Sequence, residues 1–174
     1  GQIADESTAL VETLEAVKDY YDAHPKAGIA CAMKNSGLGV GTRDTGRVRL
    51  LVRGGKVEIY SSAACIGQGV GTVLTQIVRE TTELPLELLS YQTPDTATSP
   101  DSGNTTASRQ TLFAGEAARR AALELKAALE NSDISDLEGR EFLGEYTAVT
   151  DSFGSDKENP VSHVTYSYAT HLAD

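Results

Sequence analysis

The sequence has 174 residues, of which 40% are hydrophobic and 23% are charged, and its formal net charge is −10. This length and composition predict one soluble globular domain with a substantial core rather than a disordered chain. The negative charge argues against nucleic acid and no apolar run approaches a membrane span, so we expect no nucleic-acid partner, no membrane partner and a cytoplasmic location.

The first part of the chain predicts a helix and a strand. Residues 3–22 carry apolar side chains at helical spacing, namely Leu10, Leu14, Val17 and Tyr21, before the pair His24-Pro25 ends the pattern. Residues 28–33, GIACAM, alternate larger and smaller side chains and predict a half-buried strand. Met33 is the only methionine, so a processed N-terminus and a piece of a longer polypeptide both remain open.

The middle of the chain predicts a hairpin followed by two helices. The segments RVRLLV (47–52) and KVEIYSSA (56–63) flank a Gly54-Gly55 turn, which is the pattern of a β-hairpin. Helical periodicity covers residues 67–82 and 106–129, with a short strand over 86–92 between them. In the helix over 106–129 we expect the core face to be Phe113, Ala117, Ala121, Leu125 and Ala128.

Two more strands, over residues 145–149 and 163–172, complete the predicted elements. Strands and helices alternate through the middle of the chain, and no internal repeat is present. The sequence therefore predicts an α+β (mixed α/β) fold, in which a mixed sheet contains a hairpin and strand–helix–strand units and has helices packed on it.

Two polar or glycine-rich loops each lead from a strand into a helix, in CIGQGVGT (65–72) and SGNTTASRQ (102–110). A helix N-terminus offers free N–H groups and a positive dipole end to a ligand. Glycines at 67 and 69 allow close approach to the backbone, while hydroxyls and amides come from Thr105, Thr106, Ser108, Gln68 and Gln110. The alternative is that Asn104 or Thr105 is only an N-cap and Gly-Gln-Gly only a tight turn.

Other common sites fit the sequence poorly. Thr72 stands where a dinucleotide fingerprint needs its third glycine, and no histidine lies near a nucleophile pattern. Cys31 and Cys65 provide no disulfide framework or metal cluster, although Cys65 is close enough to the turn either to approach a ligand or to be a small buried residue. Arg109 opposes the helix dipole, which indicates either a carboxylate partner or an anionic ligand.

The segments GQGVGTVLTQIVRE (67–80) and DTATSPDSGNTTASRQTLFAGEAARRAA (95–122) resemble the second cofactor-binding region of the molybdenum hydroxylases, the xanthine dehydrogenase/aldehyde oxidase family. The order of elements resembles this family from about Gly28 to Leu129, and the tail NPVSHVTYSYATHLAD (159–174) resembles its later strand. AACIGQG (63–69) with TTASRQTLF (105–113) looks closest to the selenium-dependent xanthine dehydrogenase-like branch, which favours a purine-type substrate over a simple aldehyde.

The resemblance implies molybdopterin as cofactor, as such or as its cytosine dinucleotide, and hydroxylation of a purine, heterocycle or aldehyde with water as the oxygen source. It implies that Gln68 lies near the groups around molybdenum and that the 105–110 segment surrounds the pterin and its phosphate. Metal ligands in the family come from the pterin and from exogenous groups, so no metal ligand and no catalytic residue are expected here. The implied cofactor-binding residues are Gly67, Gln68, Gly69, Thr105, Thr106, Ala107, Ser108, Arg109 and Gln110.

The sequence also departs from the family. Cys65 stands where members commonly have an acidic residue, and the Gly-x-Gly-Glu segment with the catalytic glutamate is missing. We therefore expect one domain that is a fragment of a longer subunit, with an N-terminal helix (1–25), a molybdopterin-binding core (28–130) and C-terminal loop and strands (131–174). Its implied partners are the remaining domains of that subunit and Fe–S and flavin domains or subunits. Alone it would be inactive and lack the cofactor; the alternative is a stand-alone binding or structural module.

Overall fold

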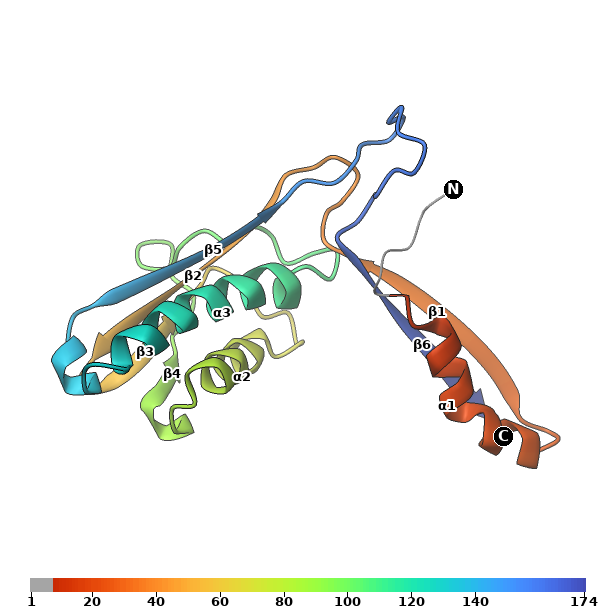
Figure 1. Ribbon diagram of the computed structural model, residues 1–174, viewed down its shortest axis with the longest axis horizontal. Coiled ribbons are helices and arrows are strands. Elements are labelled where there is room, and N and C mark those ends of the chain that lie inside the picture. Colours follow the sequence, from red (N-terminus) through yellow and green to blue (C-terminus); the bar gives the residue numbers. More distant parts are fainter. Residues whose placement is uncertain (1–7) are drawn as a thin grey trace. The chain divides into compact units, whose positions relative to one another are not determined.

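A computed structural model describes residues 8–174 of the chain (Figure 1). By its contacts the chain divides into two compact units, one of residues up to Thr42 together with Thr150–Asp174, the other of Arg43–Val149. The strand that we expected inside a 28–130 core therefore belongs to the first unit. No helix among the described residues is long and apolar enough to cross a bilayer.

The first unit is a two-stranded antiparallel ribbon with a helix against it. Strands β1 (Gly28–Ser36) and β6 (Thr165–Ala173) pair over their full lengths, and α1 (Leu10–Ala23) contacts both. The hydroxyls of Thr13 on α1 and Thr170 on β6 lie 2.9 Å apart. The helix that we predicted over 3–22 is thus present from Leu10, and residues 3–7 lie outside the described part of the chain.

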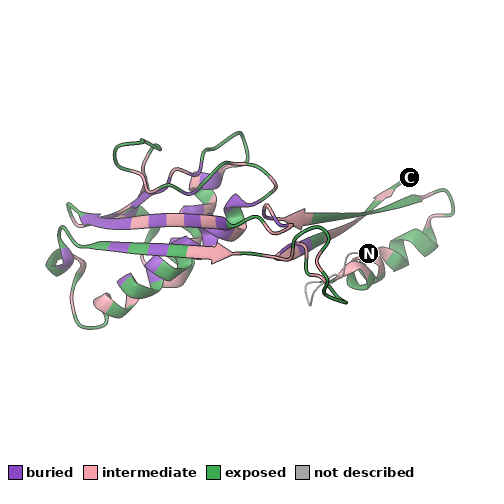
Figure 2. Cartoon of the chain, turned by 90° about the horizontal axis from the view of Figure 1, so that it is seen from above, coloured by how far each residue is buried: buried purple, intermediate pink, exposed green. Residues whose placement is uncertain are grey.

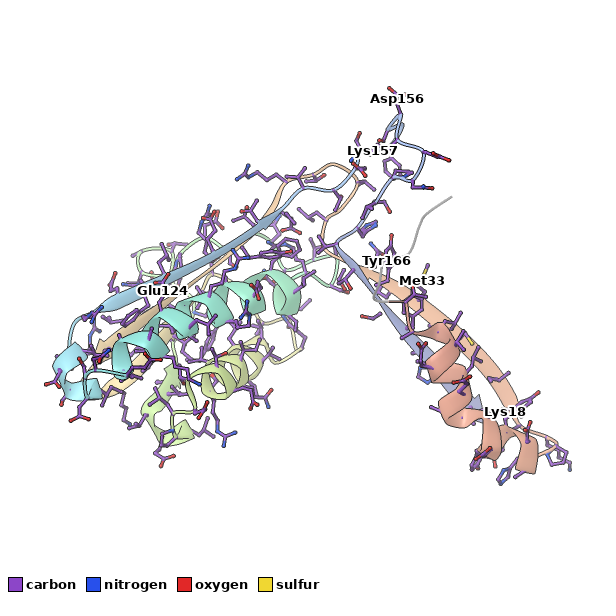
Figure 3. The ribbon with its side chains drawn as sticks, viewed as in Figure 1. Lys18, Met33, Glu124, Asp156, Lys157 and Tyr166 are labelled. Atoms are coloured by element: carbon purple, nitrogen blue, oxygen red, sulfur yellow. The ribbon has the colours of Figure 1, made fainter. Side chains whose placement is uncertain are left out.

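The predicted half-buried strand of this unit is wrong in its burial. Residues 28–34 of β1 are exposed, including Met33 at 56% (Figure 3). The alternating side chains correctly predict a strand. One helix on a two-stranded ribbon, however, covers too little of either face to bury the strand.

The second unit contains a four-stranded sheet in the order β4-β3-β2-β5, and it carries two helices on one face (Figure 1). The predicted hairpin is confirmed, and the neighbouring β5 also pairs antiparallel with β2, whereas β4 pairs parallel with β3. The α+β fold class is confirmed. The elements are β2 (Asp44–Arg53), β3 (Lys56–Tyr60), α2 (Val70–Thr82), a 3-10 turn (Leu86–Leu88), β4 (Leu89–Tyr91), α3 (Gln110–Leu129), a second 3-10 turn (Ile134–Leu137) and β5 (Glu141–Ala148).

The hydrophobic core lies between this sheet and its two helices, and Figure 2 shows the buried residues gathered there. The predicted core face of α3 is confirmed, with Ala128 only half-buried at its end. Alternate residues of the hairpin supply the sheet side of the core: Val48, Leu50, Val52, Val57 and Ile59 are all 0% exposed. Arg47 and Arg49 lie between these positions in β2 and therefore point to the opposite face.

Several element boundaries differ from the prediction, for example the start of α2 at Val70, and two further differences bear on the candidate site. The helix expected from Thr106 begins at Gln110, because Ala107 and Ser108 adopt left-handed backbone angles (φ 49° and 51°) that a right-handed helix cannot contain. The strand expected over 86–92 is shortened to β4 by the 3-10 turn that precedes it. Both differences lie at the ends of elements, next to the loops with candidate functional residues.

Candidate functional site

The polar segment between β4 and α3 is fixed to the sheet face that the helices leave open. Arg49 donates to the carbonyl oxygen of Thr98 at 2.8 Å, and Arg47 donates to that of Asp101 at 3.2 Å. Both arginines project from β2 on the side away from the core. The segment is therefore an ordered part of the second unit and not a linker between units.

The end of this segment, residues 102–109, forms a loop that we call the cradle loop. It is tied to the chain just before α2: the Ser102 N–H donates to the Ser62 hydroxyl at 2.6 Å, and the Thr105 hydroxyl donates to the Ala64 carbonyl at 2.8 Å. The two strand-to-helix loops singled out in the sequence thus lie next to each other in space.

Between these loops lies a pocket of about 380 Å³, here called the first pocket. Ile66 and Gln68 form one wall, and residues 105–111 form the other. The structure therefore brings together seven of the nine implied cofactor-binding residues: Gln68, Thr105, Thr106, Ala107, Ser108, Arg109 and Gln110. Gly69 instead lines a second pocket of about 610 Å³ with Cys65 and Tyr91, and Gly67 lines neither.

The N-terminus of α3 faces the first pocket without a side-chain cap. The N-cap residue is Arg109, and no side chain among the described residues bonds to the first-turn N–H groups. The alternative that Asn104 or Thr105 is merely the N-cap is therefore wrong, and Thr105 uses its hydroxyl on Ala64 instead. Ala107 and Ser108 have left-handed φ angles and are followed by the right-handed Arg109; a turn in which the hand of the backbone changes can point neighbouring N–H groups toward one side.

Gln110 is the buried polar side chain of the first pocket. It is 4% exposed, and its Nε2 donates to the Gly103 carbonyl at 3.2 Å and to the Thr105 hydroxyl at 3.3 Å. Its Oε1 is buried and has no hydrogen-bond partner among the described residues. A buried acceptor without a partner costs about 1–3 kcal/mol, so this oxygen is suited to a ligand that brings an N–H or O–H donor.

Gln68 reaches the same pocket but is bonded to its own turn. Its Oε1 accepts from the Ile66 N–H at 2.6 Å, and its Nε2 donates to the Ala64 carbonyl at 3.1 Å. These bonds stabilise the Gly-Gln-Gly turn, whose glycines have left-handed angles. One N–H of Nε2 and one lone pair of Oε1 are not used by these two bonds, so the Gln68 amide can also bond to a ligand in the pocket.

Arg109, for which the sequence left a carboxylate partner and an anionic ligand open, has the carboxylate partner. Its Nε donates to Oδ1 of Asp44 at 2.6 Å, and both residues are 2% exposed. Sequence reasoning missed Asp44, which lies 65 positions earlier, and also missed Ile66 and Thr111 in the pocket wall. The signal for Asp44 was indirect, since a cation at a helix N-terminus needs a nearby anion.

Cys65 is exposed, so the prediction of a small buried residue is wrong. Backbone N–H groups of the following turn, first that of Gly67 and then those of Gly69 and Val70, hold the pKa of the Cys65 thiol below its ordinary value. These donors at the start of α2 stabilise a thiolate as they would stabilise a carboxylate. The thiol thus fits the position where the resembled family commonly has an acid.

We expect alkylation of Cys65 to reach half its maximal rate at a lower pH than alkylation of an ordinary cysteine thiol does. The thiolate is the reacting form, so lowering the pKa moves the rate profile toward lower pH. Peptide mapping after iodoacetamide treatment across a pH series measures this for Cys65 alone. Cys65→Ser is the control that removes the signal, and a midpoint at or above the ordinary value would contradict the assignment.

The histidines lie outside both pockets. His163, in the first unit, is 7% exposed, and its ring packs against Gly39. Burial is the main cause that lowers the pKa of His163, and the positive charge of Lys34 is the second. His24 stacks on Tyr20 of α1 at a centroid distance of 3.9 Å. No cluster of three or more His, Cys, Asp or Glu side chains that suits a metal ion occurs in residues 8–174.

Comparison with known proteins gives one family over most of the chain. The model of a molybdopterin cofactor-binding domain matches residues 5–157. The gamma subunit of the 6-hydroxypseudooxynicotine dehydrogenase complex from Paenarthrobacter nicotinovorans is 35% identical over 118 residues, which are 68% of this chain and 15% of that protein. The putative xanthine dehydrogenase molybdenum-binding subunit XdhA of Escherichia coli K12 is 38% identical over 101 residues, 57% of this chain and 13% of that protein.

A solved structure shares the fold. Aldehyde oxidoreductase from Desulfovibrio gigas superposes with a TM-score of 0.77 at 22% identity, covering 99% of this chain and 22% of that one. The chain thus spans less than a quarter of the length of each of these three proteins.

Proposed function

We propose that this chain, which belongs to the family of molybdopterin cofactor-binding domains, binds molybdopterin in the first pocket, between the Gly-Gln-Gly turn and the start of α3. The observation that carries the proposal is the Gln110 side chain, whose buried Oε1 lacks a partner in the wall of that pocket. A pterin presents N–H donors on its ring, and one of them would satisfy this oxygen.

The anionic part of the cofactor fits the same wall. Uncapped N–H groups at the start of α3 and around Ala107 and Ser108 can donate to phosphate oxygens. These donors are neutral, which suits a chain with a net charge of −10 that would otherwise repel an anion. The strained angles at Ala107 and Ser108, about 1–3 kcal/mol each, also mark backbone that a function constrains.

The residues take different parts in this proposal. Gln110, Thr106 and Ser108 contact the cofactor with side chains and backbone, and Ala107 contributes backbone alone. Thr105 orients the cradle loop through its bond to the Ala64 carbonyl, and Arg109 supports the loop with its guanidinium, which is paired with Asp44. Gly67, Gln68 and Gly69 approach from the α2 side, and Gln68 offers the N–H and the lone pair that its bonds to the turn do not use.

When bound, the cofactor would supply metal-centred redox chemistry, and none of the chain's residues is proposed as a metal ligand. We further propose that the whole protein is a cytoplasmic oxidoreductase that hydroxylates a purine, heterocycle or aldehyde with water as the oxygen source. Fe–S and flavin domains or subunits would be its partners, and the cytosine dinucleotide form and the selenium-dependent branch remain part of the proposal. The names of the molybdenum-binding and dehydrogenase relatives support it.

The variant Gln110→Leu in the full-length protein tests the site. We expect pterin content to fall about ten-fold or more, because a buried hydrogen bond to the ligand is lost and the oxygen is replaced by an apolar group. Pterin is measured by fluorescence after oxidative release and molybdenum by mass spectrometry. Gln92→Leu, at a half-buried glutamine directly after β4 that lines neither the first nor the second pocket, is the matched control.

Two results would contradict these proposals separately. Wild-type pterin content in Gln110→Leu would refute the site, because the cofactor would then be held without this side chain. A wild-type protein that contains neither pterin nor molybdenum after expression in a host able to make the cofactor would refute the function itself.

A further inference from the structure

We propose that Arg109 and its partner Asp44 are positioning residues of the first pocket: the buried guanidinium acts as the core of the cradle loop and fixes the groups that face the ligand. This inference rests on the proposed function for what the loop binds. The placement of the loop by Arg109 follows from contacts within the chain.

The guanidinium is fully enclosed and bonded on every side. Its Nη1 donates to the carbonyls of Ser102 at 2.6 Å and Asn104 at 2.9 Å, and its Nη2 donates to that of Thr45 at 2.6 Å. Asp44 accepts from Nε at 2.6 Å and lies 2.5 Å from Nη2. A guanidinium has five N–H donors in one plane, and these contacts occupy the whole fork.

The loop has no other core. Of residues 101–108 only Ser102 is buried, and the remaining side chains are exposed or half-buried. Gly103 passes directly over the guanidinium: a Cβ at this position would lie 3.0 Å from Nη1, and its φ is 69°. The charged side chain thus takes the place that an apolar side chain has in an ordinary loop, and Asp44 neutralises it.

The contacts of Arg109 with the loop carbonyls also determine the orientation of the Gln110 side chain. The carbonyls that Arg109 binds, those of Ser102 and Asn104, flank the Gly103 carbonyl that accepts from Gln110 Nε2. Fixing the flanking peptides therefore fixes the acceptor for Nε2. With Nε2 committed, Oε1 is left for the ligand. Arg109 therefore acts on the ligand indirectly, through the loop carbonyls that it binds and through the orientation of Gln110.

A lysine cannot replace this arrangement. It keeps the charge and can pair with Asp44, but it has three donors on a single nitrogen and cannot reach four acceptors spread around a planar fork. Arg109→Lys therefore separates the charge of the side chain from its geometry.

The test uses the full-length protein and two measurements. Hydrogen exchange of the amides of residues 102–110 reports on the loop whether or not the cofactor is present, and the rate of pterin loss on gel filtration reports on binding. We expect Arg109→Lys to accelerate both about ten-fold or more, as the loss of one or more charge-assisted hydrogen bonds predicts, with exchange in the β2–β3 hairpin unchanged. Arg119→Lys, in the same helix and paired with Glu116 at the surface, is the control with no expected effect.

If Arg109→Lys fails to fold, Gly103→Ala is used to test the positioning role instead. The added methyl group displaces the loop from the guanidinium and leaves the ion pair of Arg109 with Asp44 intact. Unchanged exchange in whichever variant folds overturns the positioning role. Faster exchange with unchanged pterin loss also overturns it, because the loop would then move without effect on the ligand. Absence of pterin from the wild type refutes the proposed function instead, and local acceleration of exchange would still support the placement of the loop by Arg109.

Discussion

The variant Gly144→Ala is expected to destabilise the second unit by about 3 kcal/mol or more, at the upper end of overpacking effects. A Cβ on this residue of β5 would lie 1.8 Å from the carbonyl oxygen of Ala117 and 2.9 Å from the backbone nitrogen of Ala121. Both atoms belong to the backbone of α3 and cannot rotate away as a side chain can. The methyl group therefore forces α3 off the sheet.

Thermal or denaturant unfolding followed by circular dichroism measures this loss. Gly28→Ala is the matched control, because it also adds a methyl group to a strand glycine but its nearest neighbour is 3.8 Å away, at the Ala173 carbonyl oxygen. An unfolding free energy of Gly144→Ala equal to that of the wild type would show that α3 does not pack this closely on β5.

The close contact explains why an alanine-rich helix suits this sheet. Gly46 on β2 makes a second approach of the same kind, with a Cβ there 2.4 Å from the carbonyl carbon of Phe113. Small residues on both surfaces bring α3 near enough for its first turn to form one wall of the first pocket. Helix placement and pocket shape therefore depend on the same glycines.

Local patterns were sufficient for the hairpin and for the core face of α3. The Gly54-Gly55 turn specifies the hairpin, because its left-handed angles match a tight connection, and periodicity alone selects Phe113 to Leu125. The start of α3 was misplaced because residues 106–109 have no feature that forbids a helix. The left-handed angles of Ala107 and Ser108 occur in a loop that is held by contacts distant in sequence, such as Thr105 with Ala64.

The sequence selected residues that line one pocket, but it did not indicate how their side chains are bonded. Strand-to-helix loops and the family resemblance selected Gln68 and residues 105–110, which line one pocket. Neither indicated that Gln68 bonds to its own turn or that Asp44 neutralises Arg109, because these are properties of three-dimensional packing rather than of spacing. Burial of Arg109 in particular contradicts the expectation that arginine lies at the surface.

The second large effect is expected from Asp44→Ala, which should destabilise the chain by about 3–5 kcal/mol. The change leaves the Arg109 charge 2% exposed and without its carboxylate. Arg109→Met should cost a similar amount, because it leaves Asp44 buried and removes the donors to the Ser102 and Asn104 carbonyls. Urea unfolding of both variants measures these losses.

The double variant Asp44→Ala/Arg109→Met separates the ion pair from the rest. Because neither charge then remains buried alone, we expect its destabilisation to be smaller than the sum of the two single changes by about 1–3 kcal/mol. Glu145→Ala, which breaks the exposed pair of Arg47 on β2 with Glu145 on β5, should cost only about 0–1 kcal/mol and is the control for charge removal at the surface. Strict additivity of the two buried changes would show that Arg109 stabilises the loop through the carbonyls alone, with Asp44 contributing independently.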